Sequence, residues 1–146
     1  MKSVKTVKRL LESKGHQVFD IGPDEWVYDA IKMMAEKGVG ALLVRRKGIP
    51  VGIITERDYA RKVILKGRLS KETKIHEIMT TDLVCCRADQ TIEQCMALMT
   101  EKRVRHLPVL DEDGAVCGMI SLGDLVKSMI AEQQFVIEQL ENYIYG

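Results

Sequence analysis

The chain contains one short pattern twice. Residues 52–58 read Gly-Ile-Ile-Thr-Glu-Arg-Asp, and residues 118–124 read Gly-Met-Ile-Ser-Leu-Gly-Asp. In each copy a short apolar strand runs into a hydroxyl residue, and an aspartate follows three positions later in the first turn of an expected helix. A pattern that occurs twice in one chain, here first at 52–58 and again at 118–124, indicates a fold built from two similar halves.

The residue types in this pattern suit a sugar that carries a phosphate. A Thr or Ser at the point where a strand becomes a helix caps the N–H groups of the first turn, and that turn favours phosphate oxygens. An Asp in the same turn accepts two hydrogen bonds from the vicinal hydroxyls of a ribose. The alternative interpretation is a plain helix cap at Thr55 and Ser121 with no ligand. Two copies in register favour the ligand.

Both halves predict the same order of elements: strand, helix, strand, strand and helix. The first half places them at about 17–21, 26–37, 39–44, 50–55 and 56–65. The second half places them at about 83–86, 92–102, 104–109, 118–121 and from 124 onward. The expected fold class is therefore α/β (α+β), with two pseudo-symmetric β-α-β-β-α repeats. Since each repeat has one incompletely covered sheet, the repeats are expected to pack on each other.

Turn residues and charge predict the division of the chain. The expected parts are an N-terminal helix at 1–16, a first repeat at 17–66, a linker at 67–80, a second repeat at 81–131 and a C-terminal helical extension at 132–146. The N-terminal helix is expected to run from Val4 to Ser13 and to end at Gly15. Asp24 and Asp89 are expected to cap the first long helix of each repeat.

Composition excludes several classes of function. Hydrophobic residues make up 46% of the 146 residues and charged residues 29%, so the chain has enough apolar mass to bury a core. A net charge of +1 and an aromatic content of 5% argue against nucleic acid as a partner. No stretch approaches the roughly 18 consecutive apolar residues of a membrane span, so no membrane partner is expected. The sequence shows no nucleophile–base pair, metal cluster or Gly-rich phosphate loop, and no enzyme activity is expected.

The cysteines favour a reducing compartment. Cys85, Cys86, Cys95 and Cys117 form no C-x-x-C pair and have no His at zinc spacing. They are expected to be reduced and mostly buried, which favours a cytoplasmic location. A redox-active Cys85–Cys86 pair is an alternative, although alternation along a strand would point the two side chains to opposite faces. A degraded organelle address in the basic, amphipathic residues 1–11 is another alternative.

The tail from Asp124 to Tyr145 predicts one long helix, because no helix-breaking residue interrupts it. Its last apolar stripe exceeds what capping one repeat requires. The members of this stripe are Val136, Ile137, Leu140, Tyr143 and Ile144. The stripe either folds back on its own chain or packs against a second subunit, because an apolar stripe in water is unfavourable.

The two motifs, with Arg-His-Leu-Pro-Val at 105–109 before the second, resemble a cystathionine-β-synthase (CBS) domain pair. The resemblance covers about Gln17 to Ala131. Within that family, residues 54–68 resemble a stand-alone subgroup labelled as related to inosine monophosphate dehydrogenase. The sequence leaves no room for the roughly 250 residues of that enzyme's catalytic barrel, so the dehydrogenase activity is not expected here.

The resemblance implies a non-catalytic, energy-sensing regulatory module. Such a module would bind an adenine nucleotide (AMP, ADP, ATP or NAD) in clefts between the repeats and would assemble as a homodimer. Asp124 would hold the ribose diol, Ser121 would contact the ribose or α-phosphate, and Arg105 and His106 would meet the phosphates. The adenine would lie against the other repeat. The rest of the implied nucleotide-binding set consists of Val18, Phe19, Ile21, Val39, Gly40, Ala41 and Met119.

By pseudo-symmetry the resemblance implies a second nucleotide site at Thr55 and Asp58. The positions equivalent to Arg105 and His106 are Gly40 and Ala41, so this site lacks strand cations of its own. The candidate substitutes are Arg57, Arg61 and the neighbouring Arg105. Arg57 and Arg61 are equally explained by solvent or dimer contacts, and His106 by a place in the core. The Ser121/Asp124 site is expected to be the better nucleotide site, because phosphate affinity follows local cationic donors.

A second function from another class stays open at this point. The chain would then be a structural or protein-interaction subunit with vestigial nucleotide sites. Under the first hypothesis, a regulated partner protein is supplied in trans. The residues suit any adenosine phosphate and do not select one.

Overall fold

The computed structural model describes residues 5–145. The predicted helix start at Val4 lies outside them, and the described Lys5 and Thr6 are not yet helical, so the helix begins later than predicted. Helix α1 covers Val7–Lys14. The hydroxyl of Thr6 caps it by accepting a hydrogen bond from the N–H of Arg9. Gly15 follows at a φ of 109°, a backbone conformation that favours glycine. The predicted end of this helix at Gly15 is confirmed.

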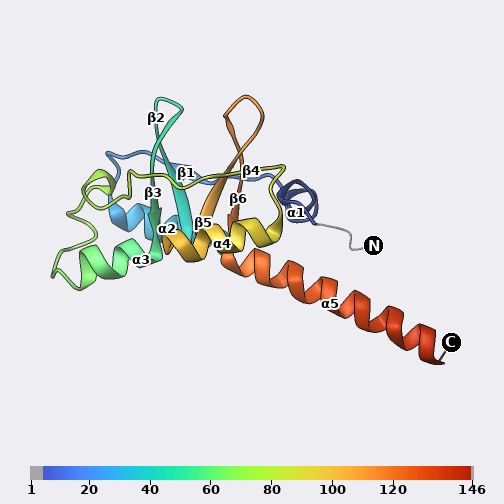
Figure 1. The fold of residues 1–146 in the computed structure, drawn as a ribbon. Helices are drawn as coiled ribbons and strands as arrows, with labels where there is room; N and C mark the ends of the chain where they lie inside the picture. Colours follow the sequence, from blue (N-terminus) through green and yellow to red (C-terminus); the bar gives the residue numbers. More distant parts are fainter. Residues whose placement is uncertain (1–4, 146) are drawn as a thin grey trace. The chain divides into compact units, whose positions relative to one another are not determined.

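The first repeat forms a three-stranded sheet in the order β1-β2-β3 (Figure 1). Strand β1 pairs with β2 in parallel, and β3 pairs with β2 antiparallel. A π-helical turn, η1, continues helix α3, and a 3-10 turn, η2, lies in the linker. The elements are β1 Asp20–Ile21, α2 Val27–Lys37, β2 Ala41–Arg46, β3 Ile49–Thr55, α3 Glu56–Tyr59, η1 Ala60–Ile64 and η2 Ile75–Glu77.

The second repeat has the same design, a three-stranded sheet in the order β4-β5-β6. Strand β4 pairs with β5 in parallel, and β6 pairs with β5 antiparallel. The elements are β4 Cys86–Arg87, α4 Ile92–Lys102, β5 His106–Leu110, β6 Val116–Ser121 and α5 Leu122–Tyr145. The predicted mixed α/β fold with two similar halves is confirmed.

The register of the two hairpins matches position by position. Ala41 pairs with Thr55 in the first sheet, and His106 pairs with Ser121 in the second. Each hairpin has its register shift at the equivalent place, after Val44 and after Val109. The predicted equivalence of Ala41 and His106 is therefore correct in structure as well as in sequence.

The chain forms two compact units, one of residues 18–83 and one that joins the first 17 residues to residues 84–146. Each unit has its own apolar core. The core of the first repeat includes Val27 on α2, Leu42 on β2 and Ile78 after η2. The core of the second repeat includes Leu11 on α1 and Leu107 on β5. Helix α1 is thus a structural part of the second repeat, although it precedes the first in sequence.

The predicted caps Asp24 and Asp89 are wrong. Helix α2 begins after Trp26 without a side-chain cap, and Asp24 pairs with Arg46 at 3.1 Å. Backbone carbonyls of the linker satisfy the first turn of α2, since Thr73 O and Ser70 O accept from its first two N–H groups at 2.8 and 3.0 Å. Helix α4 is capped by Thr91 in a reciprocal box with Gln94, at 3.1 and 2.9 Å.

The motif glycines lie where a covering segment meets the sheet. A Cβ at Gly52 would lie 2.9 Å from both Met79 Sδ and the backbone O of Thr80. A Cβ at Gly118 would lie 2.8 Å from both methyl carbons of Leu11. Residues 75–80 therefore cover the first sheet as α1 covers the second. The sequence motif requires glycine there for close packing.

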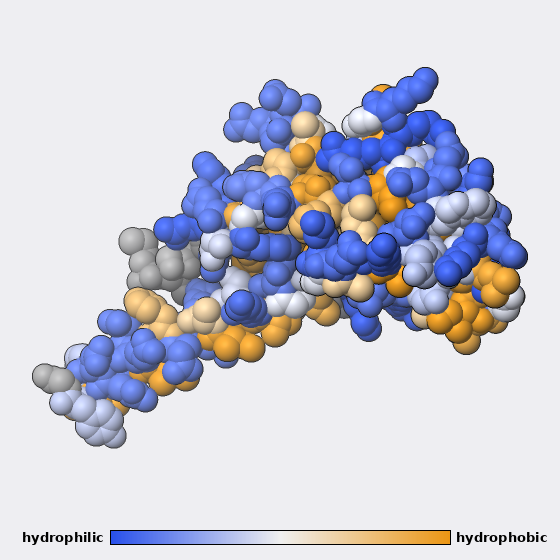
Figure 2. Space-filling view, turned by 180° about the vertical axis from the view of Figure 1, so that it is seen from behind, coloured by the Kyte–Doolittle hydropathy of each residue, from blue (hydrophilic) through white to orange (hydrophobic). Residues whose placement is uncertain are grey.

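The C-terminal half of α5 carries the predicted apolar stripe on an exposed surface. Phe135, Leu140 and Ile144 are 61%, 56% and 66% exposed. Figure 2 shows apolar side chains along this projecting helix next to polar ones. The predicted long helix is confirmed, since α5 runs without a break for 24 residues.

Across residues 5–145, no helix has the length and apolar character that crossing a bilayer requires. The same residues contain no cluster of His, Cys, Asp and Glu that suits a metal ion. All four cysteines are free thiols, with Cys86 and Cys95 buried and Cys85 and Cys117 half-buried.

Candidate functional site

The motif aspartate of the second repeat sits in a reciprocal helix cap. Asp124 Oδ2 accepts from the backbone N–H of Ser121 at 2.8 Å, and the Ser121 hydroxyl accepts from the N–H of Asp124 at 3.1 Å. This arrangement fixes the carboxylate at the end of β6, in the first turn of α5. The predicted capping role of Ser121 is confirmed.

A lysine from α1 also contacts this carboxylate. Lys14 Nζ lies 2.5 Å from Asp124 Oδ2 and donates to the backbone O of Met119 at 2.6 Å. Burial on its own would raise the pKa of Asp124, but the hydrogen bonds from Lys14 and Ser121 outweigh it and lower that pKa. The carboxylate is therefore ionised at neutral pH.

Arg105 and His106 lie beside the same cap. His106 is the register partner of Ser121, and the carbonyl of Arg105 accepts from the N–H of Leu122 at 2.9 Å. A pocket of about 570 Å³ opens there. Its lining consists of Arg105, His106, Ser121, Leu122, Gly123, Val126, Lys127 and Ile130. Asp124 lies on the same helical turn but does not line the pocket. The pocket thus combines two cations with the first turn of a helix, which suits an anion.

His106 is expected to be a neutral member of this group at pH 7. Burial lowers its pKa, the positive charges of Lys14 and Arg105 lower it further, and Asp124 acts in the opposite direction. A neutral imidazole donates one hydrogen bond and accepts another. The predicted phosphate contact of His106 would therefore be a hydrogen bond without a cation, and Arg105 would carry the charge.

The motif aspartate of the first repeat has a closed environment. Asp58 Oδ2 accepts from the N–H and the hydroxyl of Thr55, both at 3.1 Å. Its Oδ1 lies 3.1 Å from Lys62 Nζ and accepts from the Thr80 hydroxyl at 3.3 Å. Both oxygens of Asp58 are engaged within the repeat, and its side chain is 12% exposed, against 24% for Asp124.

The other predicted residues of the first repeat lie on a strand or helix or just before a strand: Ile21, Ala41 and Arg57 on β1, β2 and α3, and Val18, Phe19, Val39 and Gly40 just before β1 or β2. Gly40 O accepts from the N–H of Glu56 at 3.1 Å, so the residue before β2 lies against the start of α3. Phe19 O accepts from Leu43 N at 3.1 Å, which places Val18–Ile21 alongside β2. Arg57 is exposed on α3. A pocket of about 460 Å³ beside β2 is lined by Ile31, Met34, Ala35, Gly38, Val39, Gly40, Glu56 and Tyr59. The proposed adenine contacts of these residues stay predictions.

Sequence reasoning missed the two lysines that contact the motif aspartates. Lys62 follows Asp58 by four residues on a helix, so this spacing alone could have predicted their ion pair. Lys14 is 110 positions from Asp124, and no local signal in the sequence connects them.

The comparisons with known proteins agree with this architecture. The model of the CBS domain matches residues 16–65 and 75–131. The chain belongs to the CBS domain family. The CBS domain-containing protein CBSX3, mitochondrial, of Arabidopsis thaliana is 39% identical to it over 97% of this chain and 72% of that protein. The inosine-5'-monophosphate dehydrogenase of Methanocaldococcus jannaschii is 34% identical over 85% of this CBS protein but only 24% of the enzyme.

Solved CBS structures share the fold. A putative signal-transduction protein with CBS domains from Burkholderia ambifaria is 52% identical, with a TM-score of 0.84 over 88% of this chain and 96% of that one. The CBS domain pair of protein MJ0100, 21% identical with a TM-score of 0.78 over 89% of this chain and 99% of that one, was solved with 5'-methylthioadenosine and S-adenosyl-L-methionine. The prediction of a CBS domain pair is confirmed.

Proposed function

We propose that this CBS pair is a non-catalytic regulatory module that binds an adenine nucleotide at the Ser121/Asp124 edge of its second repeat. One observation carries the proposal: an ionised carboxylate in a helix cap lies next to a pocket that contains Arg105 and Lys127. A carboxylate suits a ribose diol, and the cations with the first helical turn suit a phosphate. The adenosyl ligands of the MJ0100 CBS pair support the ligand class.

The first repeat is a poor second site under this proposal. Lys62, Thr55 and Thr80 already occupy both oxygens of Asp58. A ribose would have to displace hydrogen bonds within the repeat, and the free energy lost with them would weaken its binding.

The test is a thermal melt of ligand-free protein with AMP, ATP, NAD and, as a control, GMP. A ligand at about 100 times its Kd should raise the Tm by about 5–10 °C for a chain of this size. Asp124→Asn should abolish the rise, because amide nitrogen replaces one carboxylate oxygen while the cap of Ser121 is kept. Asp58→Asn should retain it. A flat melt with every adenine nucleotide would reject the proposed function.

The second candidate function is a structural subunit that holds a protein partner through α5. The exposed apolar side chains of Phe135, Leu140 and Ile144 favour it. The two candidates are separable, since the nucleotide site lies at the start of α5 and this surface lies at its end. A homodimer, a regulated partner in trans and a cytoplasmic location stay predictions, and the Arabidopsis relative is described as mitochondrial.

A further inference from the structure

We propose that Lys14 determines the ligand specificity of the Asp124 site. Because of Lys14, the site binds phosphorylated nucleosides in preference to uncharged nucleosides. The inference rests on the proposed function. It concerns a residue on α1, outside both motifs. The argument depends on where Lys14 is anchored, what it contacts and what happens to its charge when a sugar arrives.

The backbone of Lys14 is held firmly on the second repeat. Val7, Leu10 and Leu11 of α1 are buried in the core of that repeat. The N–H groups of Val7 and Lys8 donate to the carbonyls of Gln90 and Ala88, both at 2.9 Å. The helix is therefore fixed relative to Asp124, and only the four-carbon side chain of Lys14 is free to move.

The ammonium group of Lys14 competes with a ribose for the carboxylate. Asp124 Oδ2 already accepts from Ser121 N–H and from Lys14 Nζ. A diol that donates to both carboxylate oxygens needs the place of Lys14 at Oδ2. Displaced from there, the ammonium keeps the carbonyl of Met119 but loses its anion. That loss is unfavourable, because a hydrogen bond between two charged groups is stronger than the one to water that replaces it at this exposed side chain.

A phosphate group compensates for this loss, and a nucleoside cannot. The charges next to Asp124 are otherwise positive, since Arg105 and Lys127 line the neighbouring pocket. A nucleotide that takes the carboxylate with its ribose brings a new anion for the displaced ammonium. An uncharged nucleoside leaves Lys14, Arg105 and Lys127 facing a carboxylate that is now covered. Lys14 therefore penalises ligands without a phosphate.

The experiment measures Kd for AMP and for adenosine by calorimetry in wild type, Lys14→Gln and Lys14→Arg. Wild type should bind AMP more tightly than adenosine. Lys14→Gln should reduce the ratio of the two Kd values about tenfold, because a hydrogen bond to a charged group contributes at least about that factor to affinity. AMP should bind more weakly and adenosine equally well or more tightly. Lys14→Arg keeps the charge and should keep most of the preference.

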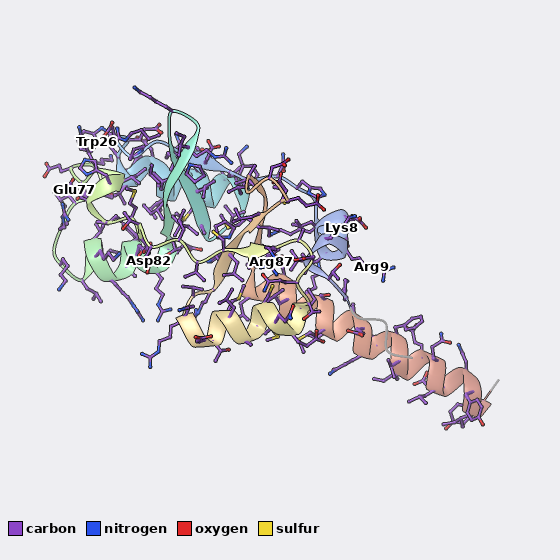
Figure 3. All side chains as sticks on the ribbon, turned by 45° about the horizontal axis from the view of Figure 1, so that its top comes forward. Lys8, Arg9, Trp26, Glu77, Asp82 and Arg87 are labelled. Carbon is purple, nitrogen blue, oxygen red and sulfur yellow. The ribbon has the colours of Figure 1, made fainter. Side chains whose placement is uncertain are left out.

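The matched control is Lys8→Gln on the same helix. Lys8 and Arg9 are exposed on α1 (Figure 3), and the Lys8 substitution removes the same charge without touching Asp124. It should leave the preference unchanged. Equal changes in both Kd values for Lys14→Gln, or none, would overturn the role of Lys14 while the proposed function stands. A wild type that binds neither AMP nor adenosine would overturn the role of Lys14, and only a flat melt with every adenine nucleotide would overturn the proposed function as well.

Discussion

Asp58 and Asp124 occupy the same motif position and differ in what surrounds them. Each closes a helix cap with the hydroxyl residue three positions earlier. Asp58 then adds Lys62 from its own helix and Thr80 from the linker, whereas Asp124 adds one lysine from α1. The motif alone predicts the cap in both copies. Residues outside the motif therefore determine how much of each aspartate carboxylate remains available to a ligand.

The motif glycines give a prediction at the residue scale. Gly52→Ala should lower the free energy of unfolding by about 1–3 kcal/mol, because its Cβ would meet the backbone O of Thr80, which cannot rotate away. Gly118→Ala should cost less, since only the flexible end of Leu11 is in the way. Urea denaturation measures both.

Gly123→Ala is the control for these variants. A Cβ there would meet only the Ser121 hydroxyl at an ordinary 3.6 Å, and alanine favours a helix. The variant should be as stable as wild type or more stable. If Gly52→Ala proved equally harmless, the close packing of residues 75–80 on the first sheet would be wrong.

His106 gives a prediction on pH dependence. Its pKa in the folded protein is below its usual value of 6.5, because of burial and the charges of Lys14 and Arg105, with Asp124 opposing them. The unfolded chain therefore binds more protons as the pH falls below about 6.5, and the contribution of neutral His106 to stability is lost in that range. Urea denaturation at pH 5, 6, 7 and 8 should show a shallower decline for His106→Gln than for wild type.

The wild-type protein, measured at the same four pH values, supplies the comparison for His106→Gln. A His106→Gln protein that declined as steeply as wild type would show that protonation of His106 does not oppose folding.

At the scale of elements, periodicity predicted which segments are helices and strands. It did not predict which groups cap the first turns of α2 and α4. The helix at Ile92–Lys102 and the helix that ends at Lys37 have the predicted bounds to within one residue. Asp24 was expected to cap because of its position, but the linker carbonyls of Ser70 and Thr73 do this work from more than 40 positions away. The box of Thr91 and Gln94 was visible in the sequence, since Thr-x-x-Gln is a capping pattern.

The end of α5 gives a prediction at the element scale. Deleting residues 134–146 should weaken self-association at least about tenfold, because the apolar stripe that includes Ile137 and Leu140 leaves with them. The Tm rise with nucleotide should persist, since Ser121 and Asp124 remain. Light scattering over a concentration series measures the association.

A double substitution tests the same surface without shortening the chain. Ile137→Asp with Leu140→Asp should reproduce the loss of association, and Glu138→Gln on the same turn should not. A truncated protein that associates as well as the full chain would show that the stripe does not join two copies.

At the scale of the whole molecule, the duplication was predictable and the place of α1 was not. Two copies of one motif were enough to expect two similar sheets, and the registers of β2–β3 and β5–β6 agree. Helix α1 precedes the first repeat in sequence, yet its Leu11 fills the core of the second. No periodicity indicates which of two similar sheets an amphipathic helix covers. Lys14 therefore could not be assigned to Asp124 before the fold was known.

One unbroken helix leaves the turn that contains Asp124 and ends at Tyr145. At 24 residues it is about 36 Å long, so a tilt of about 5° at its first turn displaces its far end by about 3 Å. A small movement of Lys14, Ser121 or Asp124 at the start of α5 would thus cause a larger displacement at its apolar C-terminal end. Under the proposed function, a protein bound to the far end of this helix would therefore respond to whether the site at Asp124 is occupied.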